Sequence, residues 1–260
     1  MRGVVYCLPG MRYFGELAAS VLGYELSVGG YVGDCDVCHI VGLYDPPNYD
    51  KTLSDTVRAK KRVIHWCGSD VSALQDASIL PEAVHVADSE GLVRELHDKG
   101  VDATCVMWPT KHHFPVTPLP ETPRIACYLG SDPIRYGSDM LQALGKAMPD
   151  TDIIAYMFGQ YTPEQMEELV DSSSVYVRLT AHDGSAASAR EFMEAGRRAV
   201  VTHELEHAKR IRRDDLGQLI VAVKKAIAEK QPDEAAAAYW REQNAVERFL
   251  RDLKGVLDGE

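Results

Sequence analysis

The stretch from residue 178 to residue 202 reads RLTAHDGSAASAREFMEAGRRAVVT. Its middle predicts a helix that opens among small residues and stops at Gly196, and its end predicts a β-branched strand. Another apolar, strand-like run, residues 175–179, leads into it. A strand, a helix and a second strand in this order are typical of an α/β fold with a parallel sheet.

The same alternation extends along the chain in both directions. Short apolar runs predict strands and the amphipathic segments between them predict helices, which indicates mostly parallel sheets with helices on both faces. The tail, 214–259, is predicted to be helical. The predicted strands are 4–8, 24–28, 37–41, 62–66, 83–87, 103–107, 124–129, 152–157, 175–179 and 199–202.

A proline-rich segment, 109–123, interrupts the alternation. Proline fixes φ and removes a backbone donor, so we expect a semi-rigid linker there. The predicted fold class is therefore α/β, with two Rossmann-like domains, 1–108 and 124–235, that face a cleft. A C-terminal helix, 236–260, is expected to pack back across that cleft. Because open α/β sheets bind ligands at the carboxyl ends of their strands, both domains would present loops to it.

Composition narrows the function classes. The 260 residues carry 28 basic and 39 acidic side chains, a formal net charge of 28 − 39 = −11, which disfavours bulk electrostatic binding to nucleic acid. No apolar run approaches the roughly 20 residues that span a bilayer, and the N-terminus lacks a signal-peptide layout, so a cytoplasmic protein is expected. The six cysteines are scattered, and Cys35 and Cys38 lie in strand-like sequence, which favours buried reduced thiols over a metal site.

Two acids, Asp183 and Glu191, stand on either side of the small residues 184–189. Small residues at a helix start leave backbone N–H groups free to face an anion, and the helix dipole adds to the attraction. An anion site flanked by acids suits a ligand with one negative end and several hydroxyls, such as a nucleotide sugar. The pattern has a second interpretation, in which Ser188 and Glu191 form a capping box and Asp183 begins a simple turn.

The acids belong to a longer set of motifs. Asp183-Gly184 is followed by Glu191-Phe-Met-Glu-Ala-Gly196, and upstream lie Leu22-Gly-Tyr-Glu-Leu-Ser-Val28, Ile64-His-Trp-Cys-Gly-Ser-Asp70 and Ala87-Asp-Ser-Glu90. In order and spacing these motifs resemble those of the retaining glycosyltransferases of the GT-B fold, in the large family 4 group. The family's acidic motif begins with Glu where this chain has Asp.

The resemblance implies a role for each acid. Glu191 would accept hydrogen bonds from the ribose hydroxyls, and Asp183 would hold hydroxyls of the donor sugar. The chemistry is electrostatic stabilisation of the leaving diphosphate while the acceptor hydroxyl attacks from the same face, so no metal and no cofactor beyond the donor is required. The backbone N–H groups that would face the sugar and diphosphate belong to Gly184, Ser185, Ala186 and Ala187.

Other matched positions would complete the donor site. Gly10, after the first predicted strand, would let its domain approach the donor phosphate, which a side chain there would obstruct. His65, at a strand end, would contact the donor sugar. His182, which precedes Asp183, would touch the leaving phosphate.

The expected cationic clamp is altered. The family has an Arg just after a strand glycine and a Lys before a second glycine, whereas the segment that begins at Gly130 has Ser131 and Tyr136 in those positions. Arg135 lies beside the second position and is the expected substitute, since a guanidinium binds phosphate bidentately. The further candidates are Arg178 and Arg190.

The expected function is transfer of a sugar from a UDP- or GDP-sugar to an acceptor hydroxyl, with retention, and the expected catalytic residues are Asp183, Arg135 and His65. The first domain is shorter than is usual in the family, which suits a large acceptor or a partner subunit; a saccharide, a lipid-linked sugar and a hydroxylated base in DNA all remain open. Two alternatives also remain: a nucleotide-sugar epimerase, and a catalytically silent nucleotide-sugar-binding or scaffold subunit, the latter suggested by the missing Arg and Lys.

Overall fold

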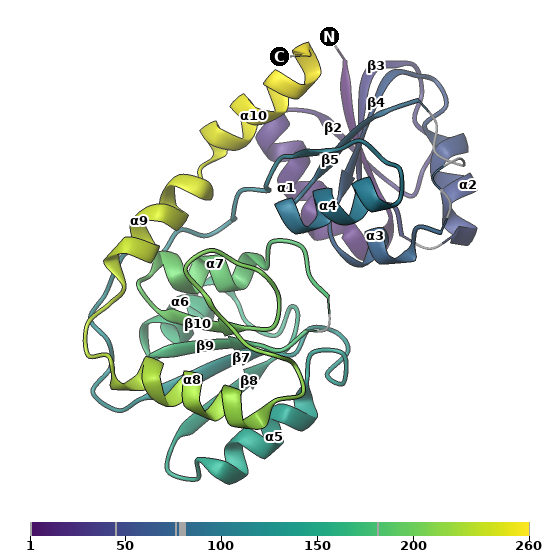
Figure 1. Cartoon of the computed structure of the whole chain (residues 1–260). Helices are drawn as coiled ribbons and strands as arrows, with labels where there is room; N and C mark the ends of the chain where they lie inside the picture. Colours follow the sequence, from purple (N-terminus) through teal and green to yellow (C-terminus); the bar gives the residue numbers. More distant parts are fainter. Residues whose placement is uncertain (1, 45, 76, 78–81, 181, 260) are drawn as a thin grey trace. The chain divides into compact units, whose positions relative to one another are not determined.

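The protein divides into two compact units, Met1–Pro109 with Ala245–Glu260, and Thr110–Asn244. The computed structural model describes residues 2–44, 46–75, 77, 82–180 and 182–259 (Figure 1). Each unit contains one parallel sheet with helices on both faces, which confirms the predicted α/β fold class. Within the described ranges, no helix combines the length and the apolar character needed to cross a membrane.

The first unit is built on a six-stranded parallel sheet with the order β2-β1-β3-β4-β5-β6. Its strands are β1 (Gly3–Cys7), β2 (Glu25–Val28), β3 (Cys35–Val41), β4 (Ala59–Trp66), β5 (Val84–Ala87) and β6 (Thr104–Cys105). Its helices are the 3-10 helix η1 (Pro9–Met11), α1 (Arg12–Leu22), α2 (Pro46–Asp55), α3 (Ser69–Ala73), α4 (Glu90–Asp98) and α10 (Val246–Asp258).

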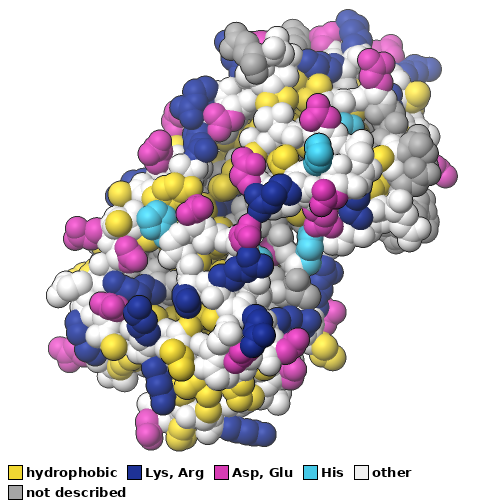
Figure 2. All heavy atoms as spheres, viewed as in Figure 1, with side chains coloured by type: hydrophobic (Ala, Val, Ile, Leu, Met, Phe, Trp, Pro, Cys, Tyr) yellow, Lys and Arg dark blue, Asp and Glu magenta, His cyan; other side chains and the backbone are white. Residues whose placement is uncertain are grey.

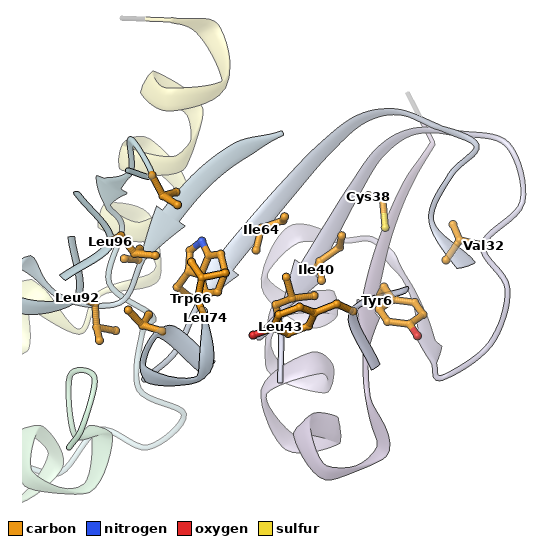
Figure 3. Packing of buried hydrophobic residues seen from close by; sticks show 14 of the residues in the cluster. Tyr6, Val32, Cys38, Ile40, Leu43, Ile64, Trp66, Leu74, Leu92 and Leu96 are labelled. Atoms are coloured by element: carbon orange, nitrogen blue, oxygen red, sulfur yellow. The ribbon is translucent and has the colours of Figure 1, made fainter. Parts of the chain in front are cut away.

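Side-chain alternation along these strands produces two cores. Successive residues of a strand point to opposite faces, so Tyr6 enters the core under α2, α3 and α4, whereas Val5 enters the core under α1 and α10. Figure 3 shows the first of these cores, in which Trp66 and Leu74 pack among buried aliphatic side chains. In the second core, Phe249 of α10 is 1% exposed. Residues far apart in sequence therefore share one core.

The second unit has a five-stranded parallel sheet with the order β11-β10-β9-β7-β8. Its strands are β7 (Arg124–Tyr128), β8 (Asp152–Tyr156), β9 (Val175–Arg178), β10 (Arg198–Val201) and β11 (Lys209–Arg210). Its helices are α5 (Ser138–Ala147), α6 (Pro163–Asp171), α7 (Ala187–Glu194), α8 (Leu216–Ala228) and α9 (Glu234–Gln243).

The two faces of this sheet differ in chemistry. Val177 and Val200 enter an apolar core with α5 and α8. Tyr176 and Arg178, which alternate with Val177 along β9, point to the face covered by α7, where the Tyr176 ring lies 4.5 Å from that of Phe192. The candidate site lies on this second face, at the carboxyl end of β9.

The C-terminal helical region, predicted as one helix over 236–260, consists of two. α9 ends at its C-cap Asn244, and the next residue, Ala245, is extended with φ −66° and ψ 135°, which separates α9 from α10. α9 packs on α7 in the second unit, whereas α10 belongs to the first.

Candidate functional site

An ion pair between Arg178 and Asp183 lies at the carboxyl end of β9. Arg178 is the last residue of the strand, and its Nε donates to the Asp183 carboxylate while its Nη1 donates to Ser188 at 3.1 Å. The side chains are 8% and 14% exposed. The guanidinium lies over two aromatic rings, 4.7 Å from the centroid of Tyr128 and 5.2 Å from that of Tyr136. The charge is thus enclosed but still reaches the surface at one edge.

Both members of this pair are ionised. Burial disfavours the charged form of Asp183, but the charges of Arg178 and His203 and the hydrogen bonds from Arg178 and the Gly184 backbone outweigh it and lower the pKa of Asp183. Burial likewise opposes the charge of Arg178, and Asp183 more than offsets it, raising the guanidinium pKa. The pair brings together two residues that the sequence placed in the donor site.

The start of α7 is built without a side-chain cap. Ala186 takes the N-cap position in the left-handed region, with φ 47° and ψ 64°, and its methyl side chain makes no cap hydrogen bond to the first turn. The predicted capping box is therefore wrong: Ser188 lies inside the helix, and its Oγ is 2.6 Å from the hydroxyl of Tyr176. Because Tyr176 and Arg178 both hydrogen-bond this hydroxyl, the Ser188 side chain is used there and does not cap the helix. Ser185 and Ala186 are buried, and Ala187 is the first helical residue.

Glu191 lies one turn further along α7 and is 8% exposed. Burial is the main cause that raises its pKa to about 8; the charge of Arg190 and a hydrogen bond from the His112 backbone oppose the shift, and Glu194 adds to it. Near neutral pH this carboxyl therefore carries a proton for much of the time. Such a group is poised to change its ionisation when a hydrogen-bonding ligand arrives.

A buried polar network that the sequence did not reveal supports this helix. Glu194 Oε2 accepts from the Asn244 amide at 2.8 Å, and Glu194 Oε1 lies 3.0 Å from Nδ1 of His113. Arg190 Nη1 donates to Oδ1 of the Asn244 side chain at 2.9 Å. Arg190, proposed as an alternative phosphate cation, is 0% exposed and belongs to this network. Partners 50 and 81 residues from Glu194 leave no local signal in the sequence.

The loop after β7 holds the altered clamp segment. Gly130 has φ +57°, and a Cβ there would lie 2.2 Å from the Tyr136 ring, so glycine allows that ring to cover the strand end beside Arg178. Ser131 and Arg135 are exposed. The Arg135 backbone is held on both sides, by the Asp132 carboxylate and by Arg213, which leaves the guanidinium on the surface. Figure 2 shows further basic side chains on the visible face of this unit, and the exposed ones in the chain include Lys209, Arg210 and Arg212.

His182 and the segment around it are fastened to the next strand. The Thr180 hydroxyl donates to the carbonyl of His182 at 2.9 Å, and the Thr202 hydroxyl donates to the carbonyl of Thr180. The loops that follow β9 and β10 are thereby joined at the carboxyl edge of the sheet. His182 thus lies at the same edge as the ion pair.

Two predicted site residues lie in the first unit instead. His65 is 0% exposed, its ring stacks on Trp108 with centroids 4.0 Å apart, and its Nδ1 lies 3.2 Å from Nε2 of His39. Burial first, and then His39, lower the His65 pKa well below its ordinary value. A ring enclosed in the core has no surface for a sugar, so we do not retain His65 as a catalytic residue. Gly10 lies in η1, is exposed, and has open space where a Cβ would stand.

Side chains that bind metals are not clustered in the part of the chain that the structure describes. Among residues 2–44, 46–75, 77, 82–180 and 182–259, no three His, Cys, Asp or Glu side chains are grouped so that they could hold a metal ion. Asp70 is also engaged: its buried carboxylate accepts hydrogen bonds from the backbone N–H groups of Leu43, Cys67 and Gly68. It therefore fixes the loop around α3.

Comparison with known proteins identifies the fold. No protein-family model and no curated protein matches the chain. Among solved structures it is similar to the lipopolysaccharide outer core galactosyltransferase WaaB, at 10% identity over 99% of this chain and 99% of that one, with a TM-score of 0.67. A glycosyltransferase from Rickettsia africae ESF-5 is similar over 100% of both chains, at 10% identity and a TM-score of 0.65.

A third similar structure contains ligands. A mutant of S. aureus TarM in complex with fondaparinux, alpha-GlcNAc-glycerol and UDP matches at 11% identity and a TM-score of 0.61, over 84% of this chain. The chain spans about half the length of TarM, 54% and 55% of the two TarM chains that match. At these identities the likeness concerns the fold alone. The fold of this chain is that of the GT-B glycosyltransferases.

Proposed function

We propose that the protein is a glycosyltransferase that moves a sugar from a UDP- or GDP-sugar to an acceptor hydroxyl, with retention of anomeric configuration. The observation that carries the proposal is the Arg178–Asp183 pair beside the uncapped start of α7, the helix that also contains Glu191, in a fold shared with glycosyltransferases. Open N–H groups at a helix start attract a diphosphate, and adjacent carboxyls accept hydrogen bonds from sugar hydroxyls.

The roles proposed for these groups are those that the family resemblance implies. Glu191 would bind the ribose, and Asp183 would bind the donor sugar through its carboxylate, whose Oδ1 accepts from the Gly184 backbone and whose Oδ2 accepts from Arg178. The backbone of 184–187 would face the diphosphate. Arg178 would supply a fixed positive charge at the strand end, and Arg135 a second one from the exposed loop. Preorganised charges of this kind stabilise a leaving diphosphate without reorganisation, so we propose transfer without a metal or other cofactor.

The proposed retaining reaction requires no nucleophile from the protein. The acceptor hydroxyl would attack on the face from which the diphosphate departs, and its proton would pass to the departing phosphate oxygen. A saccharide is the acceptor class we favour, since the TarM structure contains fondaparinux and alpha-GlcNAc-glycerol with UDP, and WaaB is described as a lipopolysaccharide outer core galactosyltransferase.

Catalytic silence is the second candidate. It is favoured by one observation: the charge of Arg178 is already neutralised by Asp183, and neither Ser131 nor Tyr136 supplies the Arg and Lys of the resembling family. In this case the protein would bind a nucleotide sugar and serve as a partner subunit.

One experiment separates the candidates. The pure protein is incubated with radiolabelled UDP-glucose, UDP-GlcNAc and GDP-mannose, with and without an oligosaccharide mixture. Nucleoside diphosphate release that depends on acceptor supports the transferase; epimerised sugar supports an epimerase; binding without turnover supports the silent subunit. EDTA should leave the transferase rate unchanged.

The role of Glu191 is tested separately by calorimetry. Glu191→Ala should weaken nucleotide-sugar binding by about 1–3 kcal/mol, the scale of a lost hydrogen bond to a charged or buried group. Glu168→Ala, on the exposed side of α6, is the matched control and should bind like the wild type. Unchanged affinity with a lower melting temperature would restrict Glu191 to a structural role.

A further inference from the structure

His203 lies at the same edge of the sheet as the Arg178–Asp183 pair. In the register of the sheet, Val201 of β10 is opposite Arg178 of β9, and His203 follows Val201 by two residues. The Thr202 hydroxyl, next in sequence to His203, donates to the carbonyl of Thr180. The backbone that carries His203 is therefore tied directly to the segment that leads into Asp183.

The imidazole of His203 makes no hydrogen bond to the residues that the structure describes. Within the described part of the chain, Nδ1 and Nε2 are both covered from solvent and neither is hydrogen-bonded. Other enclosed histidines differ: His39 is bonded to His65, and His85 accepts from the Trp66 indole. Leaving two polar nitrogens covered and unpaired costs folding free energy, and such groups require an explanation.

The charges that act on this ring belong to the candidate site. They come from Asp183, Arg178, Arg210 and His182. Burial is the main cause that lowers the His203 pKa to about 4, with Asp183 opposing the shift. A neutral imidazole has one N–H donor and one acceptor nitrogen, so it can pair with both a phosphate oxygen and a sugar hydroxyl.

We propose that His203 is a donor-contacting residue whose ring hydrogen-bonds the sugar–diphosphate part of the bound nucleotide sugar, beside Asp183. This inference rests on the proposed function. The residue as a whole is partly exposed, and the proposal requires a side-chain rotation that brings a ring nitrogen to the surface. The ligand then supplies the hydrogen bonds that the protein does not.

This role makes a specific prediction about stability and binding together. Truncating a side chain that supports folding lowers the stability of the protein. The His203 ring makes no hydrogen bond to the described residues, so its truncation removes none. We therefore expect His203→Ala to melt within a few degrees of the wild type while binding UDP-glucose or GDP-mannose at least about tenfold more weakly. His203→Asn, which retains a donor and an acceptor, should recover part of the affinity.

The matched control lies four residues away in the same loop. His207 is exposed, has φ +61°, and places its ring 4.8 Å from that of Tyr239. Asn tolerates such a φ, so His207→Asn should fold and should bind nucleotide sugars like the wild type.

We test the role of His203 by calorimetric titration and thermal melting of each variant. The ligands are UDP, GDP, UDP-glucose and GDP-mannose. Weaker binding of the free diphosphates identifies a phosphate contact, and weaker binding of the sugar conjugates alone identifies a sugar contact; both support the inference. Wild-type affinity in His203→Ala overturns it, as does a joint loss of affinity and melting temperature that Asn does not relieve. If the wild type binds none of the four ligands, the proposed function itself fails.

Discussion

The Arg178 guanidinium and the Asp183 carboxylate form an enclosed ion pair, and the guanidinium lies over the adjacent rings of Tyr128 and Tyr136. Removing one member leaves the other charged in a poorly solvated place. We expect Arg178→Met and Asp183→Leu each to lower the free energy of unfolding by about 3 kcal/mol. The double variant should lose less than the sum, because no unpaired charge remains.

Urea unfolding of the single and double variants measures this coupling. The surface pair of Arg124 and Asp152, 2.7 Å apart and 33% and 48% exposed, is the matched control. Breaking that pair should cost about 0–1 kcal/mol. Strictly additive losses at Arg178 and Asp183 would contradict an energetic pair.

Glu191 should make stability depend on pH in an unusual direction. Its pKa is raised from 4.5 to about 8 in the folded protein, so between these values the folded state holds a proton that the unfolded chain has released. Stability from this group is complete below about pH 4.5 and is lost as pH rises through about 8, at about 1.4 kcal/mol per pH unit between these values. Glu191→Gln, which cannot titrate, should lack this slope.

The measurement is urea unfolding of both proteins at pH 5, 6, 7 and 8. The stability of the wild type relative to Glu191→Gln should fall steadily across the series. Parallel profiles would show that the carboxyl ionises in the folded protein as it does in the unfolded chain.

Arg135 should affect turnover but not folding. Its guanidinium is exposed, so Arg135→Ala is expected to melt like the wild type while the rate of sugar transfer falls about 100-fold, the scale of one lost electrostatic contact to a leaving group. Arg212→Ala removes another exposed arginine of the same unit, one paired with Asp215, and should retain wild-type turnover. Normal kinetics in Arg135→Ala would assign the phosphate role to Arg178 alone.

Gly130 should be irreplaceable for a steric reason. Alanine at either Gly130 or Gly159 meets the same backbone strain, about 1–2 kcal/mol, since both have positive φ, +57° and +70°. Only at Gly130 does the added Cβ meet a ring, that of Tyr136 at 2.2 Å, whereas nothing lies within 4 Å at Gly159. Gly130→Ala should therefore unfold at lower urea concentration than Gly159→Ala, and it alone should weaken nucleotide-sugar binding. Equal losses would show that Tyr136 moves aside freely.

The parallel sheets could be predicted because their signals are local. The apolar runs at 124–129 and 175–179 alternate with helical periodicity, and strand pairing follows from that order. The two acids Asp183 and Glu191 could also be identified from the sequence, because they are close to each other along the chain, on either side of the start of one helix. β11, only two residues of a basic run, gave no strand signal.

The parts that could not be predicted depend on distant residues. The local sequence indicates Ser188 as a helix cap, but in the structure its hydroxyl bonds to Tyr176 and Arg178. The local sequence indicates His65 as a strand end that could contact a ligand. In the structure Phe249, 184 positions later, helps to enclose its ring. The Glu194–Asn244 bond joins residues 50 positions apart. Short-range patterns contain no information on such contacts.

The return of the chain to the first unit has a consequence for synthesis on the ribosome. The second unit is complete once Asn244 has emerged, but the first still lacks Phe249 and Leu253 of α10, which fill its core. The later-translated unit can therefore finish folding before the earlier one, the reverse of the usual N-terminal-first order. Until residues 245–258 arrive, the part of that apolar sheet face which α1 does not cover stays exposed in the nascent chain and needs protection from aggregation.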